Sequence, residues 1–421
     1  MTITALGAIL GFAIAIVLII YQVPPVYGMM IGALIGGLAG GAPLIDTISY
    51  MISGASGMVS GIMRIIAAGM LAGFLIQSGS AETIAHTIVH AMGKKYALLA
   101  VIFAAWVLQA VGTFGDVVVV IVAPIALDIA MHTGYSRAAA SISLIGGIHA
   151  GNIVSPNANT IALAENFNLP LTTVMIGGLI PSVFGILFSY IFMNALRNRG
   201  PMVDSDSIER ISESSDLPSF RRAMIGPICT ILLLMLRALV GITIDPIVAL
   251  PLGGVIGTIA CGKTRQMMNF ATTGINRMSS IVLLLLGTGT ISGIITNSAL
   301  KDVLVHFVEV SGMPGFLLAP LSGIIMGGAT ASCIAGSTVA SQIFGSTILS
   351  FGVTSIQAAV MIHAGCCVFD CLPHGSFFHI SAGTLQMAIK ERMAIIPWES
   401  LVGFVMTVVA TIVYGVLTFT F

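Results

Sequence analysis

The chain has 421 residues, of which 57% are hydrophobic and 8% charged, with 16 basic and 16 acidic side chains. A soluble domain carries about 25% charged residues, so this composition is that of a polytopic membrane protein. The zero net charge gives no indication of a nucleic-acid partner. The first apolar stretch is long enough to span a bilayer and lacks a basic region before it, which argues against a cleavable signal peptide.

The first half is predicted to hold five membrane crossings and one hairpin, since a crossing needs roughly 20 apolar residues. The predicted crossings are 3–21, 25–42, 57–77, 137–154 and 172–196. Before the fourth crossing, 81–92 has the pattern of an amphipathic interfacial helix. Both arms of 97–131 are short for a full span, so this segment is predicted to be a re-entrant hairpin with its tip at Thr113–Asp116.

The fourth crossing is interrupted by a polar stretch, Gly151–Thr160, after which apolar residues continue to about 166. Pro156 removes a helix hydrogen bond and pushes Ser155 out of the helical region. In hydrocarbon, backbone groups freed in this way survive only when they are buried in protein or line a wet cavity. The stretch therefore predicts a transporter binding site, and the alternative is an ordinary loop at a helix end.

The second half repeats this pattern after a polar segment, 197–222, which is predicted to be a linker. The predicted crossings are 223–241, 246–262, 278–297, 355–371 with a continuation to 389, and 395–419. A second hairpin is expected over 314–349, with its tip near Ala331–Thr338. A second break, Asp370–Ser376, interrupts the fourth crossing of this half.

Short matches in constant order relate the halves. Gly73–Ser78 aligns with Gly293–Ser298, and His149 with His363, each followed by Ala-Gly. Because each half has five crossings and a hairpin, the odd number inverts the second repeat. We predict an all-α polytopic membrane protein of two inverted repeats, 1–196 and 223–421, with broken helices at the midplane.

The distribution of basic residues predicts the orientation. One side of this arrangement receives Lys94, Lys95, Arg137, Arg197, Arg199, Arg210, Arg221, Arg222, Lys263, Arg265, Arg277, Lys390 and Arg392, and the other Arg64, Arg237 and Lys301. The positive-inside rule makes the first side cytoplasmic. Both termini are then external, the linker is cytoplasmic, and the expected location is a bacterial inner membrane.

Two hairpin tips and two breaks are expected to converge near the midplane, where their neutral oxygens and amides suit a hydroxylated carboxylate or a sodium ion. The substrate-binding candidates are Thr113, Gly115, Asn152, Ser155, Asn157, Asn159, Thr160, Ser337, Thr338, His374 and Ser376. Glu165, Asp128 and His379 are weaker candidates.

Four ionisable residues are candidates for binding the coupling ion or proton. Asp116 is the foremost, because a carboxylate deep in a membrane is costly and by default functional; the alternative is a cap on the following helix. His149 and His363 occupy equivalent positions before the two breaks, although a lone histidine is usually a packing residue. Asp370 and His374 lie in the second break and could instead pair with each other.

No catalytic motif is present, and the chain is not expected to be an enzyme. The six cysteines show no CxxC pairing and the histidines no metal-ligand spacing, so no metal or other cofactor is expected. Without a nucleotide site, transport must be driven by an ion gradient or by the substrate itself.

The sequence from Ser78 to Pro124, and again from Gly312 to Gly415, resembles the gluconate permease family of the ion-transporter superfamily. The family places an acidic residue before a valine at its first hairpin, as in Asp116-Val117, and the run Gly336–Ala340 is similar to its Gly-Ser-x-Thr-Val-Ala segment with one residue missing. Ile396–Ser400 matches a start of the last helix that contains Trp and Glu. The resemblance implies an elevator-type secondary transporter that is a homodimer.

Both breaks depart from the family pattern. SPNANT stands where the family has a proline-rich run, and the second break lacks its His-Val-Asn-Asp. SPNANT is similar to the Ser-Asn-Thr signature of sodium-coupled dicarboxylate carriers. The prediction is therefore import of a small organic anion, a hydroxy or sugar acid, with H⁺ or Na⁺. The alternatives are an amino-acid carrier of the same fold, or an ion antiporter or channel without an organic substrate.

Overall fold

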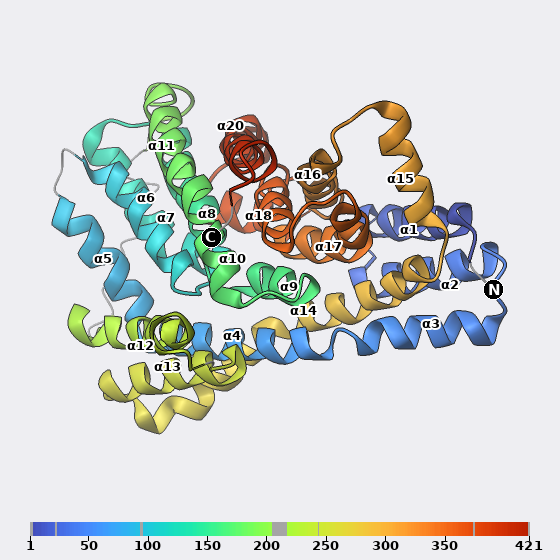
Figure 1. Cartoon of the computed structure of the whole chain (residues 1–421). Helices are drawn as coiled ribbons and strands as arrows, with labels where there is room; N and C mark the ends of the chain where they lie inside the picture. Colours follow the sequence, from blue (N-terminus) through green and yellow to red (C-terminus); the bar gives the residue numbers. More distant parts are fainter. Residues whose placement is uncertain are drawn as a thin grey trace.

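The computed structural model describes residues 3–21, 23–92, 96–203, 217–242, 244–373 and 375–419, and it is built from α-helices (Figure 1). The all-α prediction is confirmed. The helices of the first half are α1 Ala5–Ile20, α2 Pro25–Ala39, α3 Leu44–Ser56, α4 Val59–Gln77, α5 Ser80–Met92, α6 Ala97–Ala110, α7 Gly115–Thr133, α8 Arg137–Asn152, α9 Ala158–Asn166, α10 Leu171–Gly177 and α11 Leu179–Ala195.

The polar segment 197–222 separates the two halves, and its residues 204–216 lie outside the described residues. The helices of the second half are α12 Phe220–Val240, α13 Pro246–Ala260, α14 Met267–Thr296, α15 Leu300–Ser311, α16 Leu318–Thr330, α17 Cys333–Ser350, α18 Ser355–Cys366, α19 Ser376–Thr384 and α20 Ile389–Ala410, which continues as a π-helix over Thr411–Val416. In both halves a helical hairpin precedes a broken helix: α6–α7 precedes α8–α9, and α16–α17 precedes α18–α19.

The helices form two layers that lie one above the other in Figure 1. We call α1–α4 with α12–α14 the long-helix layer, and α6–α11 with α16–α20 the hairpin layer. Helices α5 and α15 connect the layers at opposite ends of the molecule. Contacts of α14 with α17 and of α4 with α9 join the layers directly.

The long-helix layer is held together by close backbone approach between α14 and the α3–α4 pair. Gly54 faces Gly293, and Gly73 faces Gly274, so that a Cβ on either member would meet the opposite backbone. Small residues permit this approach in membranes, where helices gain little from apolar burial alone. The sequence analysis placed no helix over 44–56 because that stretch is shorter and more polar than a crossing, whereas the structure shows α3 there.

Two further features differ from the predicted elements. Helix α14 has 30 residues and begins well before the predicted 278, so Arg277 lies inside the helix and not at its cytoplasmic end. Arg392, which was counted among the cytoplasmic charges, is fully buried and pairs with Glu399, Nη1 to Oε1 at 2.8 Å. Its guanidinium also donates from Nε to the Ser381 hydroxyl at 2.9 Å. Arg392 and Glu399 lie two turns apart on one face of α20, so the pairing is local, and it is the burial of this face that keeps Arg392 away from the predicted cytoplasmic surface.

Four helical segments of the described residues are long and apolar enough to cross a bilayer, and the bent pair α10–α11 is a fifth candidate. The four are Val59–Gln77, Gly115–Thr133, Thr264–Thr296 and Ile389–Val416. The expectation that both arms of the first hairpin are short is therefore wrong for α7: at 1.5 Å per residue its 19 residues extend about 28 Å. The other predicted crossings correspond to shorter apolar helices.

An ion-pair cluster at Arg64 connects the two layers. The Arg64 guanidinium donates to both carboxylate oxygens of Asp245, at 3.1 and 2.6 Å, within the long-helix layer. It also pairs with Glu165 on α9 of the hairpin layer. Donation from Arg64 holds the pKa of Asp245, which caps α13 from the loop before it, below its ordinary value.

We expect Asp245→Asn to lower the free energy of unfolding at pH 7 by at most about 1 kcal/mol, because the pair is partly exposed. A carboxyl whose folded-state pKa is depressed stabilises the fold above its unfolded value and ceases to do so as pH falls through the folded-state value. The difference should therefore shrink below the ordinary value of 3.8. Thermal unfolding in detergent across pH measures it, and Asp128→Asn, whose partner His132 is exposed, is the control. A difference that grows on acidification would contradict this assignment.

Candidate functional site

A cavity of 560 Å³ lies where the two hairpins and the two broken helices meet, bordered by α14 on the side of the long-helix layer. Four helices, α7, α9, α17 and α19, begin at its wall. The lining residues from their caps and first turns are Phe114, Gly115, Asp116, Val117, Asn157, Asn159, Ser332, Cys333, Ile334, Ala335, Gly375, Ser376 and Phe377.

The four helix N-termini that converge on this cavity favour a negatively charged ligand there. The first amides of a helix have no intrahelical acceptor, and the helix dipole adds about half a positive charge at that end. Asn157 and Ser332 satisfy part of this need in α9 and α17 through their side chains. The caps of α7 and α19, Phe114 and Gly375, make no side-chain bond. Their amides are left for a ligand or for water.

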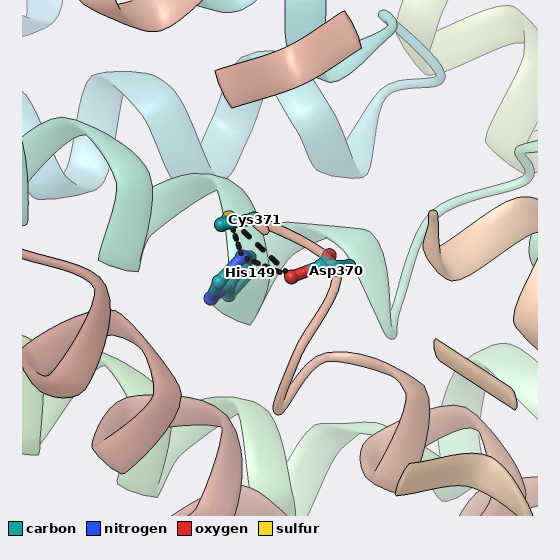
Figure 2. A group of neighbouring side chains, drawn as sticks. All are labelled: His149, Asp370 and Cys371. Atoms are coloured by element: carbon teal, nitrogen blue, oxygen red, sulfur yellow. Dashed lines mark hydrogen bonds and ion pairs between the residues drawn. The ribbon is translucent and has the colours of Figure 1, made fainter. Parts of the chain in front are cut away.

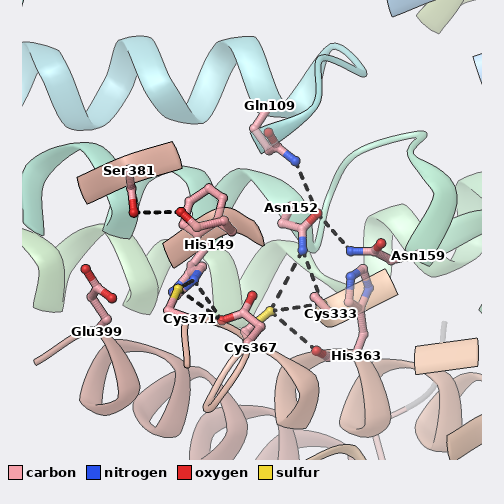
Figure 3. Close-up of polar contacts among 12 residues, drawn as sticks. Gln109, His149, Asn152, Asn159, Cys333, His363, Cys367, Cys371, Ser381 and Glu399 are labelled. Atoms are coloured by element: carbon pink, nitrogen blue, oxygen red, sulfur yellow. Dashed lines mark hydrogen bonds and ion pairs between the residues drawn. The ribbon is translucent and has the colours of Figure 1, made fainter. Parts of the chain in front are cut away.

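Asn152 connects the first break to both hairpins (Figure 3). Its side-chain oxygen accepts from Gln109 at 3.2 Å, from Asn157 at 2.5 Å and from Asn159 at 2.9 Å. Its amide nitrogen donates to the Cys333 sulfur at 3.3 Å. Gln109 ends the first arm of one hairpin, Cys333 begins the second arm of the other, and the Asn152 amide also lies 4.0 Å from the Cys367 sulfur at the end of α18. This one residue therefore contacts all four converging elements.

Asn157 caps the helix that follows the break. Its side-chain oxygen accepts from the backbone amides of Asn159 and Thr160, at 3.1 and 3.2 Å, and from the Thr160 hydroxyl at 3.2 Å. Its amide nitrogen also donates to the Asn152 carbonyl at 3.1 Å, which closes the end of α8. One side chain thus satisfies both helix ends that the proline exposes.

The second break meets the first through His149 (Figure 2). His149 Nε2 lies 3.2 Å from Asp370 Oδ1 and 3.5 Å from the Cys371 sulfur. Cys371 donates to Asp370 Oδ1 at 3.4 Å. Asp370 therefore pairs with His149, and His374, its suggested partner, lies outside the described residues. The two breaks are joined at ionisable side chains, as Figure 3 also shows.

Asp116 and Arg277 face the cavity from the two layers. Helix α7 begins at Gly115 with Phe114 as its cap, so Asp116 lies in the first turn and the cap interpretation is wrong. Within the described part of the chain, Asp116 makes no hydrogen bond and Arg277 no ion pair. A carboxylate and a guanidinium thus border the same space without a direct bond to a side chain of the described residues.

The cavity wall receives eight of the residues that the sequence analysis selected: Gly115, Asp116, His149, Asn152, Asn157, Asn159, Asp370 and Ser376. Five further substrate candidates and His363 are buried beside the cavity but are not part of its wall: Thr113, Ser155, Thr160, Ser337 and Thr338. Both ring nitrogens of His363 lack a hydrogen-bond partner among the described residues.

The tip of the second hairpin is shorter than predicted. It consists of Ala331, in the left-handed region at φ 44°, and Ser332, the cap of α17. Ser337 and Thr338 consequently lie one turn inside α17, where Thr338 bonds back to the Ile334 carbonyl at 2.9 Å. Gly336, beside them, packs directly against Gly327 of the other arm.

Three cavity residues that bond to Asn152 or carry charge are absent from the candidates predicted from sequence: Gln109, Arg277 and Cys333. Gln109 is a lone polar residue in an apolar helix, which is a usable signal. Arg277 is predicted to lie before the third crossing of the second half, whereas α14 begins earlier. Cys333 has no local signal, and only the arrangement in space brings it to Asn152.

A model of the family described as GntP family permease matches residues 2–419. The chain belongs to the GntP permease family. This confirms the resemblance to gluconate permeases, and because the family consists of permeases the chain is a transporter and not an enzyme. Its multi-pass membrane character follows from the family and from the apolar helices.

Among GntP permeases, an uncharacterized transporter of Haemophilus influenzae is 50% identical over 99% of this chain and 100% of its own. A gluconate permease of Pseudomonas aeruginosa is 22% identical, covering 79% of this chain and 80% of its own. The Gnt-II system L-idonate transporter of Escherichia coli is 21% identical, covering 77% and 80%. The Alcanivorax borkumensis YdaH transporter, whose crystal structure is described as revealing an unusual topology, has the same fold: TM-score 0.67, 14% identity and 89% of both chains covered.

We expect Asn152→Ala to destabilise the protein by about 1–3 kcal/mol, because three buried donors lose their shared acceptor. Thermal unfolding in detergent measures the change. Asn166→Ala is the matched control: Asn166 donates a single side-chain bond, to Ser341 at 2.7 Å, and its loss should cost less. Equal losses of unfolding free energy in the two variants would show that the bonds to Asn152 stabilise the protein no more than the single Asn166 bond does.

Proposed function

We propose that this GntP permease is a secondary active transporter that imports a small organic anion, a hydroxy or sugar acid. The observation that carries the proposal is the convergence of four helix N-termini with Arg277 around one cavity. Backbone amides and a guanidinium together favour a carboxylate over a neutral or cationic solute. The cavity volume of 560 Å³ lies within the range of small-molecule sites.

The amide side chains support a hydroxylated ligand. Gln109, Asn157 and Asn159 border the cavity, and carboxamides both donate to and accept from hydroxyl groups. Two relatives are named for gluconate and L-idonate, which are polyhydroxylated acids. The alternatives are an amino-acid carrier and an ion antiporter or channel, and the substrate test below distinguishes them from an acid transporter.

Asp116 is proposed to couple transport to a proton. An ionised Asp116 would repel an anionic substrate in the same cavity, and protonation would remove that repulsion. Binding of the anion and of the proton then favour each other, which is the requirement for symport. His149, His363 and Asp370 were the other coupling candidates. Sodium, held by the oxygens of the first break, is the alternative coupling ion.

The transport cycle is proposed to be of the elevator type, with the hairpin layer moving against the long-helix layer. The Arg64 cluster supports this, because Arg64 stays with Asp245 in one layer while its contact with Glu165 crosses between the layers. We further propose two inverted repeats joined by the cytoplasmic segment 197–222, external termini, an inner-membrane location and a homodimer that anchors the long-helix layer.

Counterflow in proteoliposomes against a panel of hydroxy acids, sugar acids and hydroxylated amino acids should give exchange with an acid. Arg277→Gln should raise the KM for that acid about tenfold or more, because a charged hydrogen bond contributes about 1.5–3 kcal/mol. Arg265→Gln, on the short helix that precedes α14, is the control and should leave KM unchanged. Exchange of amino acids alone, or of no organic solute, would overturn the substrate class.

The Asp116→Asn variant is expected to lose uphill accumulation in an imposed pH gradient and to keep exchange of internal for external substrate. The amide imitates the protonated acid, so binding survives while the proton cannot be carried. Uptake is measured with pH and sodium gradients imposed separately, with Asn157→Ala beside it. Normal accumulation by Asp116→Asn would exclude the proton site, and a sodium requirement lost in Asn157→Ala would favour sodium coupling through the first break.

A further inference from the structure

Four of the six cysteines, Cys333, Cys366, Cys367 and Cys371, are buried near the point where the second hairpin tip meets the second break. Two groups of possible metal ligands share Asp370 there. One is His149, Asp370 and Cys371, and the other is Cys333, Cys367 and Asp370. The transport function proposed above uses none of these sulfur atoms.

We propose that His149, Asp370 and Cys371 bind a thiophilic divalent cation with the coordination chemistry of Zn²⁺. Imidazole nitrogen, thiolate sulfur and carboxylate oxygen form a ligand set typical of zinc, whereas Mg²⁺ and Ca²⁺ take oxygen ligands. Carboxylate and thiolate together supply two negative charges, which match the charge of a divalent ion.

The distances between the three ligand atoms fit one face of a tetrahedron. Metal–ligand bonds of roughly 2.0–2.3 Å place tetrahedral neighbours roughly 3.3–3.8 Å apart. The observed separations are 3.2 Å from His149 Nε2 to Asp370 Oδ1, 3.5 Å from Nε2 to the Cys371 sulfur and 3.4 Å from that sulfur to Oδ1. Little movement is therefore needed to admit an ion (Figure 2).

Access and surroundings also suit a metal. His149 and Asp370 border the cavity, which supplies an entry route and a fourth ligand position for water. Cys333 and Cys367, with sulfur atoms 3.6 Å apart, form the adjacent group and are the competing ligand set. A bound ion would link the first break to the second, since His149 belongs to α8 whereas Asp370 and Cys371 follow α18.

The test is Co²⁺ titration of the purified full-length protein, followed by Zn²⁺ competition. One equivalent of Co²⁺ should give the visible bands of tetrahedral coordination together with thiolate-to-metal charge transfer. Cys371→Ser and His149→Gln should each weaken binding at least tenfold, while Cys229→Ser, a cysteine outside the cluster, should bind as the wild type does. Zn²⁺ should also raise the melting temperature of the wild type, and Mg²⁺ should not.

Absence of the tetrahedral spectrum, or wild-type affinity in Cys371→Ser, would overturn the proposal, because the three side chains would then form only a hydrogen-bonded group. Binding that is lost in Cys333→Ser with Cys367→Ser but kept in Cys371→Ser would also overturn it and assign the ion to the adjacent group. A melting curve without metal establishes that each variant is folded. Where Cys371→Ser is not folded, Cys371→Ala replaces it.

Discussion

The structure depends on one constraint: a helix broken inside a membrane must have its exposed backbone groups satisfied by protein or by a wet cavity. The first break meets this constraint with Asn157, which bonds to the helix end before the break and to the helix start after it. Asn152 then binds the repaired break to the two hairpins. The first backbone amides of α7 and α19 face the cavity, where a ligand can accept hydrogen bonds from them.

This arrangement explains why a polar site can exist in so apolar a chain. Amides of Asn and Gln satisfy backbone and one another without net charge, so their burial costs little once they are paired. The ionisable side chains at the site itself are Asp116 and Arg277 at the cavity wall, and His149 with Asp370 between the breaks. These are the positions where the proposed anion, proton and metal would bind.

Close glycine contacts occur in both layers and join helices by backbone approach, as between Gly54 and Gly293 in the long-helix layer. In the hairpin layer, side-chain bonds also link helices, as from Trp106 of α6 to Ser182 of α11 at 2.9 Å. Between the layers, Arg64 contributes ionic contacts that are partly exposed. These contacts fit the movement of one layer against the other that is proposed above.

The sequence by itself determined the membrane class, the hairpin and broken-helix elements of each half and the polar breaks, because hydropathy, proline and helix-breaking residues act locally. It also led to Asn152, Asn157 and Asp116, since polar groups at membrane depth are costly wherever they fall. Only the tertiary structure determined which of these side chains contact one another. Asp370 bonds to His149, more than 200 positions away, and Cys333 reaches Asn152. Arg277 faces the cavity because α14 begins well before it, at Met267, and packs against α3 and α4. Such pairings arise from the crossing of helices distant in sequence, and no local pattern records them.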